Sequence, residues 1–511
     1  MVIGGVGTAR PAGPGDTAVV ATASGTARGT VTSGHRLFAG IPYAAAPIGA
    51  LRWKPPAPPA HWGGIRDATT VGAQCPQQRA ASVRGPGDVG GNEDCLFLNV
   101  WTPARAAAAK RPVLVWIHGG AFAVGSGNFY DPSRLVAAGD MVVVTINYRL
   151  GALGFLADPA LSDDGQVGNF GLMDQQAALR WVRDNITAFG GDPARVTIAG
   201  ESSGATSVCD HLVAPGSAGL FGAAIMQSGR CQPQAPRETA ARMSADYAAK
   251  LGCPAAAPAA VARCLRALPV YKLVATPLTY LTSGGVSAPG PVTGQELLPD
   301  DPVTAMRAGK TVKVPVLLGN NHDESTALIA FTKPPSTTGQ YLDDLVQDFG
   351  PDADKVAALY PAASYGHPAS ALAAALTDYD FACPAAAMAG FLSHGGPVYE
   401  YEFDDSNAAA PAGVPTLPFP LGAAHTFELP YLFGVTGMLN PATATQQSLS
   451  TQMIAYWAAF VNTGNPQAPN QPGWPRHTDA QVLILRPDAT VISTDFTQQH
   501  HCDQWATIPT P

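Results

Sequence analysis

The chain has 511 residues, which is long enough to fill a large hydrophobic core. Only 13% of the residues are charged and the formal net charge is −8, with no block of Lys and Arg. A nucleic acid is therefore not an expected partner. No apolar run reaches the roughly 18 residues that a membrane-spanning helix needs.

The chain opens with a segment that we expect to be a flexible tail over residues 1–17. This segment lacks the charged and apolar regions of a signal peptide. Beyond it we find neither an internal repeat, which argues against solenoids and propellers, nor a break in composition. We expect residues 18–511 to form a single domain, in which the segment 332–382 is mostly helical.

Short apolar runs rich in β-branched residues alternate with helical patterns along the chain. The runs at 111–120 and 140–149 suit strands buried on both faces, and apolar residues recur at helical spacing over 171–191. Further strands are expected at 195–200, 222–229 and 314–321. This alternation predicts an α/β fold with a central, mostly parallel β-sheet flanked by helices, plus a small N-terminal β-region. In such sheets the chemistry gathers at the carboxyl ends of the strands.

One glycine-rich turn carries two adjacent serines, in the stretch RVTIAGESSGAT at 195–206. The pattern Gly-x-Ser-x-Gly between a strand and a helix is typical of a strained turn that exposes a nucleophilic serine. Ser202 has a glycine two residues before it and another two residues after it, whereas Ser203 has Glu and Ala at those places. We predict that Ser202 is a nucleophile and that the backbone N–H of Ser203 faces a developing oxyanion.

Six stretches spread along the chain form one series of motifs. They are GIPYAAAPIGALRWKPP (40–56), NEDCLFLNVWTP (92–103), VWIHGGAF (115–122), GNFGLMDQQAALRWVRDNITAFGGDPARVTIAGESSGA (168–205), GNNHDES (319–325) and AAHTFELPYLFG (423–434). In these stretches the sequence resembles the type-B carboxylesterase family, which includes cholinesterases and bacterial carboxylesterases. The similarity runs from about residue 18 to about residue 506. It implies the α/β-hydrolase fold and a serine esterase.

The resemblance implies Ser202 as nucleophile, Glu324 as acid and His425 as base, in the chain order of α/β-hydrolases. The chemistry agrees with these residue types. A serine hydroxyl needs a base during attack, histidine can take and return that proton, and a carboxylate orients the imidazole. Asp323, directly before Glu324, is the alternative acid. His118 lies in the glycine loop and is expected to be structural.

The resemblance also implies an oxyanion hole made by the N–H groups of Gly120 and Ala121, joined by Ser203. Many relatives have a third glycine where this chain has Ala121, and its methyl group is expected to hinder bulky esters. Glu201 is a candidate to stabilise the imidazolium electrostatically. Ser228 is a candidate to hydrogen-bond to the acid or its surroundings. Either residue could instead have a structural role only.

The eight cysteines are even in number and contain no CxxC pair. This pattern favours disulfides over a metal cluster, and therefore an oxidising compartment, with buried free thiols in a cytosolic enzyme as the alternative. The resemblance implies the bridges Cys75–Cys95, Cys253–Cys264 and Cys383–Cys502. We expect the two that remain, Cys209 and Cys231, to pair by elimination. Secretion with a removed leader is the expectation that follows.

The loop between Cys75 and Cys95 contains no aromatic residue. Cholinesterases carry a tryptophan in this loop that binds a quaternary ammonium group, so choline esters are not expected substrates. We expect a hydrolase of broad specificity for small-molecule alkyl or aryl esters that acts through an acyl-enzyme, as a monomer and without cofactor or metal. The alternatives are a lipase or polyesterase for long-chain or polymeric esters, and a non-catalytic module like the neuroligins. The presence of Ser202 and His425 argues against the non-catalytic module.

Overall fold

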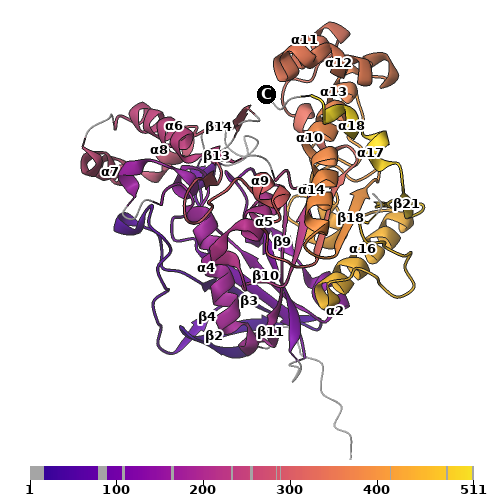
Figure 1. The fold of residues 1–511 in the computed structure, drawn as a ribbon. Helices are drawn as coiled ribbons and strands as arrows, with labels where there is room; N and C mark the ends of the chain where they lie inside the picture. The colour runs from indigo at the N-terminus through magenta and orange to yellow at the C-terminus, as the bar shows by residue number, and fades with distance from the viewer. Residues whose placement is uncertain are drawn as a thin grey trace, which may run out of the picture.

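A large, strongly twisted β-sheet runs through the centre of the computed structural model (Figure 1). The described residues are 17–78, 89–105, 110–162, 166–231, 234–253, 257–282, 285–287, 289–414, 416–478 and 481–508. The expected tail over 1–17 therefore lies outside the described residues except for its last residue, which begins the first strand.

The central sheet has 13 strands in the order β1-β2-β3-β7-β10-β8-β11-β12-β17-β18-β20-β21, with β4 paired to β2. These strands are β1 (Thr17–Thr22), β2 (Gly25–Val31), β3 (His35–Pro42), β4 (Ile65–Asp67), β7 (Phe97–Pro103), β8 (Arg111–Ile117), β10 (Val142–Ile146), β11 (Gly191–Glu201), β12 (Ala223–Gln227), β17 (Val316–Asn321), β18 (Val398–Phe403), β20 (Val482–Leu485) and β21 (Val491–Ser493). Every neighbouring pair from β10 to β20 is parallel. The expected N-terminal β-region is the antiparallel edge of this same sheet.

The central strands are buried on both faces, as their apolar sequences predict. In β8, Val113, Val115 and Ile117 pack into the core on one face of the sheet. Leu114 and Trp116 pack into a second core on the other face. The alternation follows from the two-residue period of a strand, because successive side chains point to opposite faces. The strand is therefore apolar throughout, which only a sheet covered on both sides can accommodate.

Helices from different parts of the chain cover the two faces. Those packed on the central strands are α2 (Ser133–Gly139), α4 (Phe170–Asn185), α5 (Ser203–Val213), α14 (Cys383–Ser393) and α16 (Ala444–Thr463). α4 and α5 bury apolar side chains in the first core, and α2 and α16 bury theirs in the second. The expected helix over 171–191 is α4 followed by a short 3-10 turn, Ile186–Phe189. The α/β arrangement predicted from the sequence, a mostly parallel central sheet flanked by helices, is thus confirmed.

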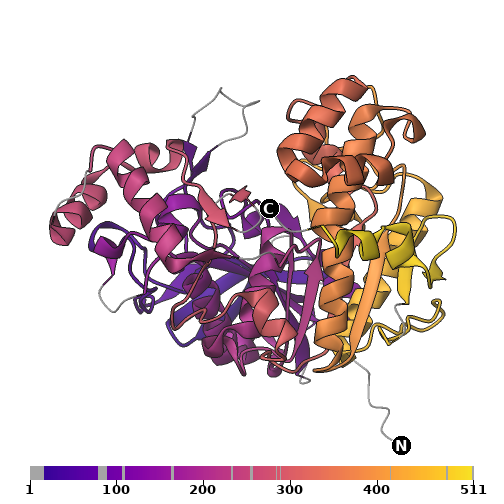
Figure 2. The same cartoon turned by 45° about the horizontal axis from the view of Figure 1, so that its top comes forward.

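Two groups of helices rise on opposite sides above the sheet (Figures 1 and 2). One group is α6 (Arg237–Lys250), α7 (Pro258–Ala267) and α8 (Val270–Ala275). The other comprises α10 (Glu324–Ala330), α11 (Thr338–Phe349), α12 (Ala353–Leu359), α13 (Pro368–Thr377), α17 (Phe496–Gln499) and α18 (Cys502–Trp505). The helical pattern expected over 332–382 is confirmed by α11 to α13. No helix within the described ranges is both long and apolar enough to cross a membrane.

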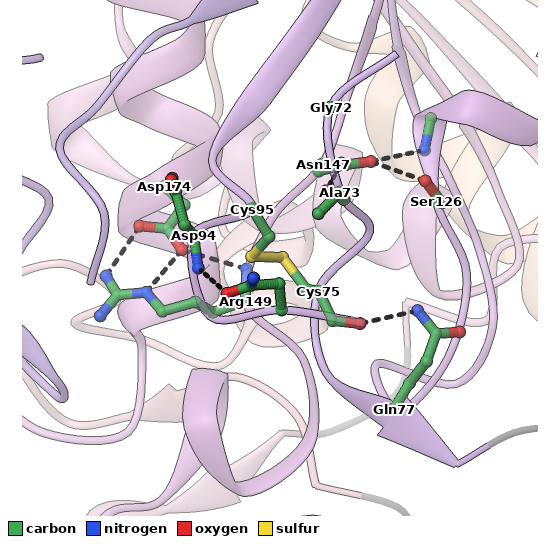
Figure 3. Close-up of a disulfide and its surroundings, with 12 residues drawn as sticks. Gly72, Ala73, Cys75, Gln77, Asp94, Cys95, Ser126, Asn147, Arg149 and Asp174 are labelled. Atoms are coloured by element: carbon green, nitrogen blue, oxygen red, sulfur yellow. Dashed lines mark hydrogen bonds and ion pairs between the residues drawn. A yellow bond between two sulfur atoms is a disulfide. The ribbon is translucent and has the colours of Figure 1, made fainter. Parts of the chain in front are cut away.

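All eight cysteines form disulfides in the structure. The pairs are Cys75–Cys95, Cys209–Cys231, Cys253–Cys264 and Cys383–Cys502. Cys75–Cys95, drawn in Figure 3, joins two cysteines that lie 20 positions apart in sequence. Cys383–Cys502 joins the start of α14 to α18, which lie 119 residues apart in sequence. The four pairs are those expected from the sequence.

Candidate active site

A sharp turn between β11 and α5 presents Ser202 at the carboxyl edge of the sheet. Ser202 has φ 55° and ψ −126°, a conformation that L-residues other than glycine rarely adopt. A Cβ atom on Gly204 would lie 2.0 Å from the carbonyl oxygen of Ile117, and one on Gly200 would lie 2.4 Å from the backbone of Gly204. The two glycines are therefore required by close packing of the turn against β8, and they leave the strained serine between them exposed to the site.

The imidazole of His425 lies between two buried carboxylates. Its Nδ1 is 2.6 Å from Oε2 of Glu324, and its Nε2 is 3.2 Å from Oε1 of Glu201. Glu324 is fully buried, and its second oxygen accepts a hydrogen bond from the backbone N–H of Asn321 at 2.8 Å. The Ser202 hydroxyl has no hydrogen-bond partner among the described residues. The structure thus brings His425 to Glu324 and to the residue directly before Ser202.

Backbone pairing holds the acid and the histidine together, although about 100 residues separate them in sequence. The N–H of His425 donates to the carbonyl of Glu324 at 3.2 Å, and the N–H of Asp323 donates to the carbonyl of Ala423 at 3.1 Å. The carboxylate of Asp323 accepts the N–H of Ala423 in return, at 2.9 Å. Asp323 therefore holds the loop that carries His425 in place, whereas Glu324 contacts the imidazole. This division separates the two acids that the sequence left as alternatives.

The charges around His425 change its ionisation. Burial disfavours the charged imidazole, but the carboxylates of Glu201 and Glu324 outweigh this effect and raise the pKa of His425. Burial also raises the pKa of Glu201 far above its ordinary value, and the nearby Glu428 adds to this effect. Because both groups are buried and 3.2 Å apart, they share protons and titrate as a pair.

Glu428 is a buried acid that sequence reasoning missed. It accepts hydrogen bonds from the side-chain amides of Gln227 at 3.0 Å and Asn321 at 2.8 Å. Gln227 in turn accepts from the indole N–H of Trp457 at 3.0 Å. This network anchors the segment that follows His425 beneath the ends of β12 and β17. The available signal was a carboxylate inside the apolar run FELPYLFG, which must be paired if it is buried.

Three backbone N–H groups next to Ser202 are free to bind a ligand. Those of Gly120, Ala121 and Ser203 have no acceptor among the described residues. Gly120 and Ala121 belong to a loop in the left-handed region, with φ 115° and φ 54°, and Phe122 continues it with φ 56°. The carbonyl of Gly119 contacts Nδ1 of His118 at 2.8 Å. This contact fixes the peptide plane and therefore the opposite direction of the Gly120 N–H.

A cavity of about 960 Å³ opens beside these groups. Its lining includes Gly119, Gly120, Glu201, Gln77, Leu429 and Met438. On the other side of the imidazole, the Phe381 ring lies with its centroid 5.4 Å from that of His425. Arg230 covers the outer face of Phe381 at 4.7 Å and pairs with Asp380 at 2.6 Å. This stack could not be predicted from the sequence, because Arg230, Phe381 and His425 lie in three separate segments of the chain.

Ser228 does not make the hydrogen bond expected of it. Its buried hydroxyl has no partner among the described residues, and only its backbone N–H bonds, to the carbonyl of Gly319 at 2.8 Å. Glu324 is already bonded to His425 and Asn321. The expected link fails because the left-handed backbone of Ser228, φ 52°, turns the chain at the end of β12.

Comparisons with known proteins agree with this geometry. Residues 16–505 match the sequence profile of the Carboxylesterase family. The chain belongs to the carboxylesterase family. This carboxylesterase is 35% identical to the para-nitrobenzyl esterase of Bacillus subtilis (strain 168), over 93% of its own length and 96% of that protein. It is 36% identical to an acylcarnitine hydrolase of Mus musculus, over 89% of its own length and 83% of that protein.

Solved structures give the same result for the fold. A PNB esterase structure, 34% identical, superposes on the carboxylesterase with a TM-score of 0.77 and covers 94% of this chain and 98% of that chain. The family and these relatives establish that the protein is a carboxylic ester hydrolase, as its sequence predicted. A non-catalytic binding module is correspondingly disfavoured.

Proposed function

We propose that this carboxylesterase cleaves small alkyl and aryl esters through an acyl-enzyme on Ser202, with His425 as base and Glu324 as acid. The contact of 2.6 Å between Nδ1 of His425 and Glu324 carries the proposal, because it orients the imidazole with Nε2 beside Glu201, the residue directly before Ser202. An exposed serine on a strained turn and an oriented imidazole are the parts that nucleophilic acyl transfer needs.

In the first half of the reaction, the Ser202 Oγ attacks the acyl carbon while Nε2 of His425 takes its proton. The carbonyl oxygen becomes negative and accepts hydrogen bonds from the N–H groups of Gly120, Ala121 and Ser203. The C–O bond to the alcohol then breaks, and the leaving alcohol takes the proton from His425. Water repeats these steps against the acyl-enzyme and releases the acid. Nε2 lies 3.2 Å from Glu201, and the proposal requires that it hydrogen-bond to the Ser202 Oγ when the ester is bound.

Glu201 supports the charged imidazole that forms in both halves of the reaction. Its carboxylate lies 3.2 Å from Nε2 and is almost fully buried, where water screens charge poorly. Glu428 lies behind it as a further buried acid that raises the pKa of His425. The site therefore favours a positive imidazole once Ser202 has lost its proton.

The cavity lining supports small, uncharged esters as substrates. Glu201 is the one charged side chain among the residues that line the cavity. Uncharged polar groups come from Gln74, Gln77, Gln78, Tyr130, Thr426 and Thr436, and the other lining residues are glycine or apolar. The para-nitrobenzyl esterase of Bacillus subtilis, a relative at 35% identity, carries in its name an ester of a benzylic alcohol, which is an alkyl ester that bears an aromatic ring. We extend that preference to this chain.

The test is hydrolysis of p-nitrophenyl esters from acetate to palmitate by the wild type and by Ser202→Ala, His425→Ala and Glu324→Gln. Ser202→Ala should lower kcat by roughly 10⁴-fold or more without changing the unfolding temperature. Ser203→Ala keeps its backbone N–H but removes the Oγ that accepts the N–H of Phe122 in the neighbouring loop at 3.2 Å, so its loss of activity should be clear but well below that of Ser202→Ala. Full activity of Ser202→Ala would refute the assignment. A rate that rises with chain length above the micelle threshold would favour a lipase instead.

We also propose that the protein is exported and works in an oxidising environment. Four disulfides support this, because such bridges persist outside the reducing cytosol. Protein isolated from its native cells should show no reactive thiols in denaturant without reductant. Eight reactive thiols per chain would contradict the proposal.

A further inference from the structure

The oxyanion loop, which we define as residues 118–125, is strained and must be held in place by its surroundings. Ala121 and Phe122 are non-glycine residues with φ near +55°, a strained conformation that persists only where the surrounding structure holds it. At its centre, the N–H of Phe122 donates to Oγ of Ser203 at 3.2 Å, and the N–H of Gly151 donates to the carbonyl of Phe122 at 2.7 Å. These bonds do not reach the far end of the loop at Gly125, which is held by a different contact.

Gln77 makes that contact with both ends of its side-chain amide. The N–H of Gly125 donates to Oε1 of Gln77 at 2.9 Å, and Nε2 of Gln77 donates to the carbonyl of Gly125 at 2.8 Å. The Gln77 side chain is buried, with 7% of its surface exposed. The N–H and the carbonyl of Gly125 belong to the two peptide groups on either side of its Cα, and Gln77 makes one hydrogen bond to each. These bonds fix the position and the orientation of Gly125, because neither peptide group can rotate without breaking its bond.

The disulfide Cys75–Cys95 holds Gln77 where it can do this. Nε2 of Gln77 also donates to the carbonyl of Cys75 at 3.0 Å, as Figure 3 shows beside the bridge. Gln77 begins the short strand β5 (Gln77–Gln78), which pairs with β6 (Val89–Gly90) across the loop that the disulfide closes. On its other side, Cys95 leads directly into β7 of the central sheet. The bridge therefore connects Gln77 to a rigid strand.

We propose that Gln77 is a positioning residue for ester hydrolysis, and that the Cys75–Cys95 disulfide acts on turnover through it. Gln77 holds Gly125 and thereby keeps the N–H groups of Gly120 and Ala121 directed at the oxyanion. The inference rests on the proposed oxyanion role of these groups. Loss of one oxyanion donor costs about 10²- to 10³-fold in kcat. Gln77 displaces donors rather than deleting them, so its loss should cost roughly 10- to 100-fold.

The first experiment compares Gln77→Met with Gln295→Met. Gln295 is a matched control, since it also bonds both groups of one backbone residue: Val167 N–H donates to Oε1 at 2.8 Å and Nε2 donates to Val167 O at 2.7 Å. It is 6% exposed and lies outside the site. Both variants should lose similar thermal stability. Only Gln77→Met should lower kcat on p-nitrophenyl butyrate.

A transition-state analogue separates positioning from general loosening. An alkyl trifluoromethyl ketone adds to the serine and places a negative oxygen in the oxyanion hole, whereas KM reports the neutral ester. Gln77→Met should weaken the ketone's inhibition by the same factor as it lowers kcat/KM, with KM changed less than about threefold. Unchanged kcat and unchanged inhibition in Gln77→Met would overturn the proposal. If Ser202→Ala kept its activity, the proposed function itself would fail, which is a distinct result.

The second experiment tests the route through the disulfide. Cys75→Ala/Cys95→Ala should lower kcat by about the same factor as Gln77→Met, whereas Cys253→Ala/Cys264→Ala, which removes a bridge far from the site, should not. Combining Gln77→Met with loss of Cys75–Cys95 should lower kcat by less than about threefold beyond either change alone, because both changes break the same connection to Gly125. Fully multiplicative effects would show that the disulfide does not act through Gln77.

Discussion

Replacing Glu201 by glutamine should move the pH dependence of ester hydrolysis to lower pH. In the proposed mechanism His425 must be neutral to accept the Ser202 proton, so kcat/KM should rise with pH through the pKa of His425. The Glu201 carboxylate, 3.2 Å from Nε2, favours the protonated imidazole and raises that pKa. Glutamine keeps the size and a hydrogen-bonding oxygen but removes the charge. The pKa of His425 must then fall, and the acid limb must follow it.

The expected shift can be bounded from the geometry. Two unit charges 3.2 Å apart interact by about 5 kcal/mol at an effective dielectric constant of 20, equivalent to about 4 pKa units. This is an upper limit, because burial raises the pKa of Glu201 and keeps part of it protonated. Glu324 still contacts Nδ1 in the variant and maintains part of the elevation. We expect a shift of about 1 to 2 units.

The assay is kcat/KM for p-nitrophenyl butyrate at constant ionic strength from pH 5 to pH 10. Glu238→Gln, which removes one negative charge from the exposed surface of α6, is the control and should leave the profile in place. At the optimum, kcat of Glu201→Gln should also fall, since the charged imidazole of the transition state has lost a partner. An acid limb that stays in place or moves to higher pH would refute the electrostatic reasoning.

Two further predictions concern stability. Gly204→Ala should lower the free energy of unfolding by more than about 3 kcal/mol in denaturant titrations, because its Cβ would meet the Ile117 carbonyl at 2.0 Å. Gly390→Ala, in a helix with open space around it, should be neutral or stabilising. For His500, burial disfavours the charge, but the ion pairs with Asp378 at 2.6 Å and Glu402 at 3.0 Å outweigh it, and the pKa rises to about 10. The difference in the free energy of unfolding between wild type and His500→Gln, measured by calorimetry, should be largest below pH 6.5 and should shrink as the pH rises through 10. A difference that grows with pH instead would contradict this prediction.

The sequence alone indicated the order of elements and the serine turn. The apolar run of β8 and the spacing Gly-Glu-Ser-Ser-Gly are local patterns, and each reflects packing that any α/β sheet imposes on its own strand or turn. The same holds for the choice of Ser202 over Ser203. The residues Glu324 and His425 followed from family motifs, because nothing local distinguishes one acid from its neighbour Asp323.

Contacts between distant segments could be decided only by the tertiary structure. It placed Nε2 of His425 against Glu201, buried Glu428 behind both, and left Ser228 without the bond expected of it. It also set Gln77 against Gly125, 48 residues away. Hydrophobic periodicity reports which face of an element is buried, but it carries no information on which polar groups meet there. Contacts between these polar groups depend on how the strands are ordered and where the loops cross, and both are properties of the whole folded chain.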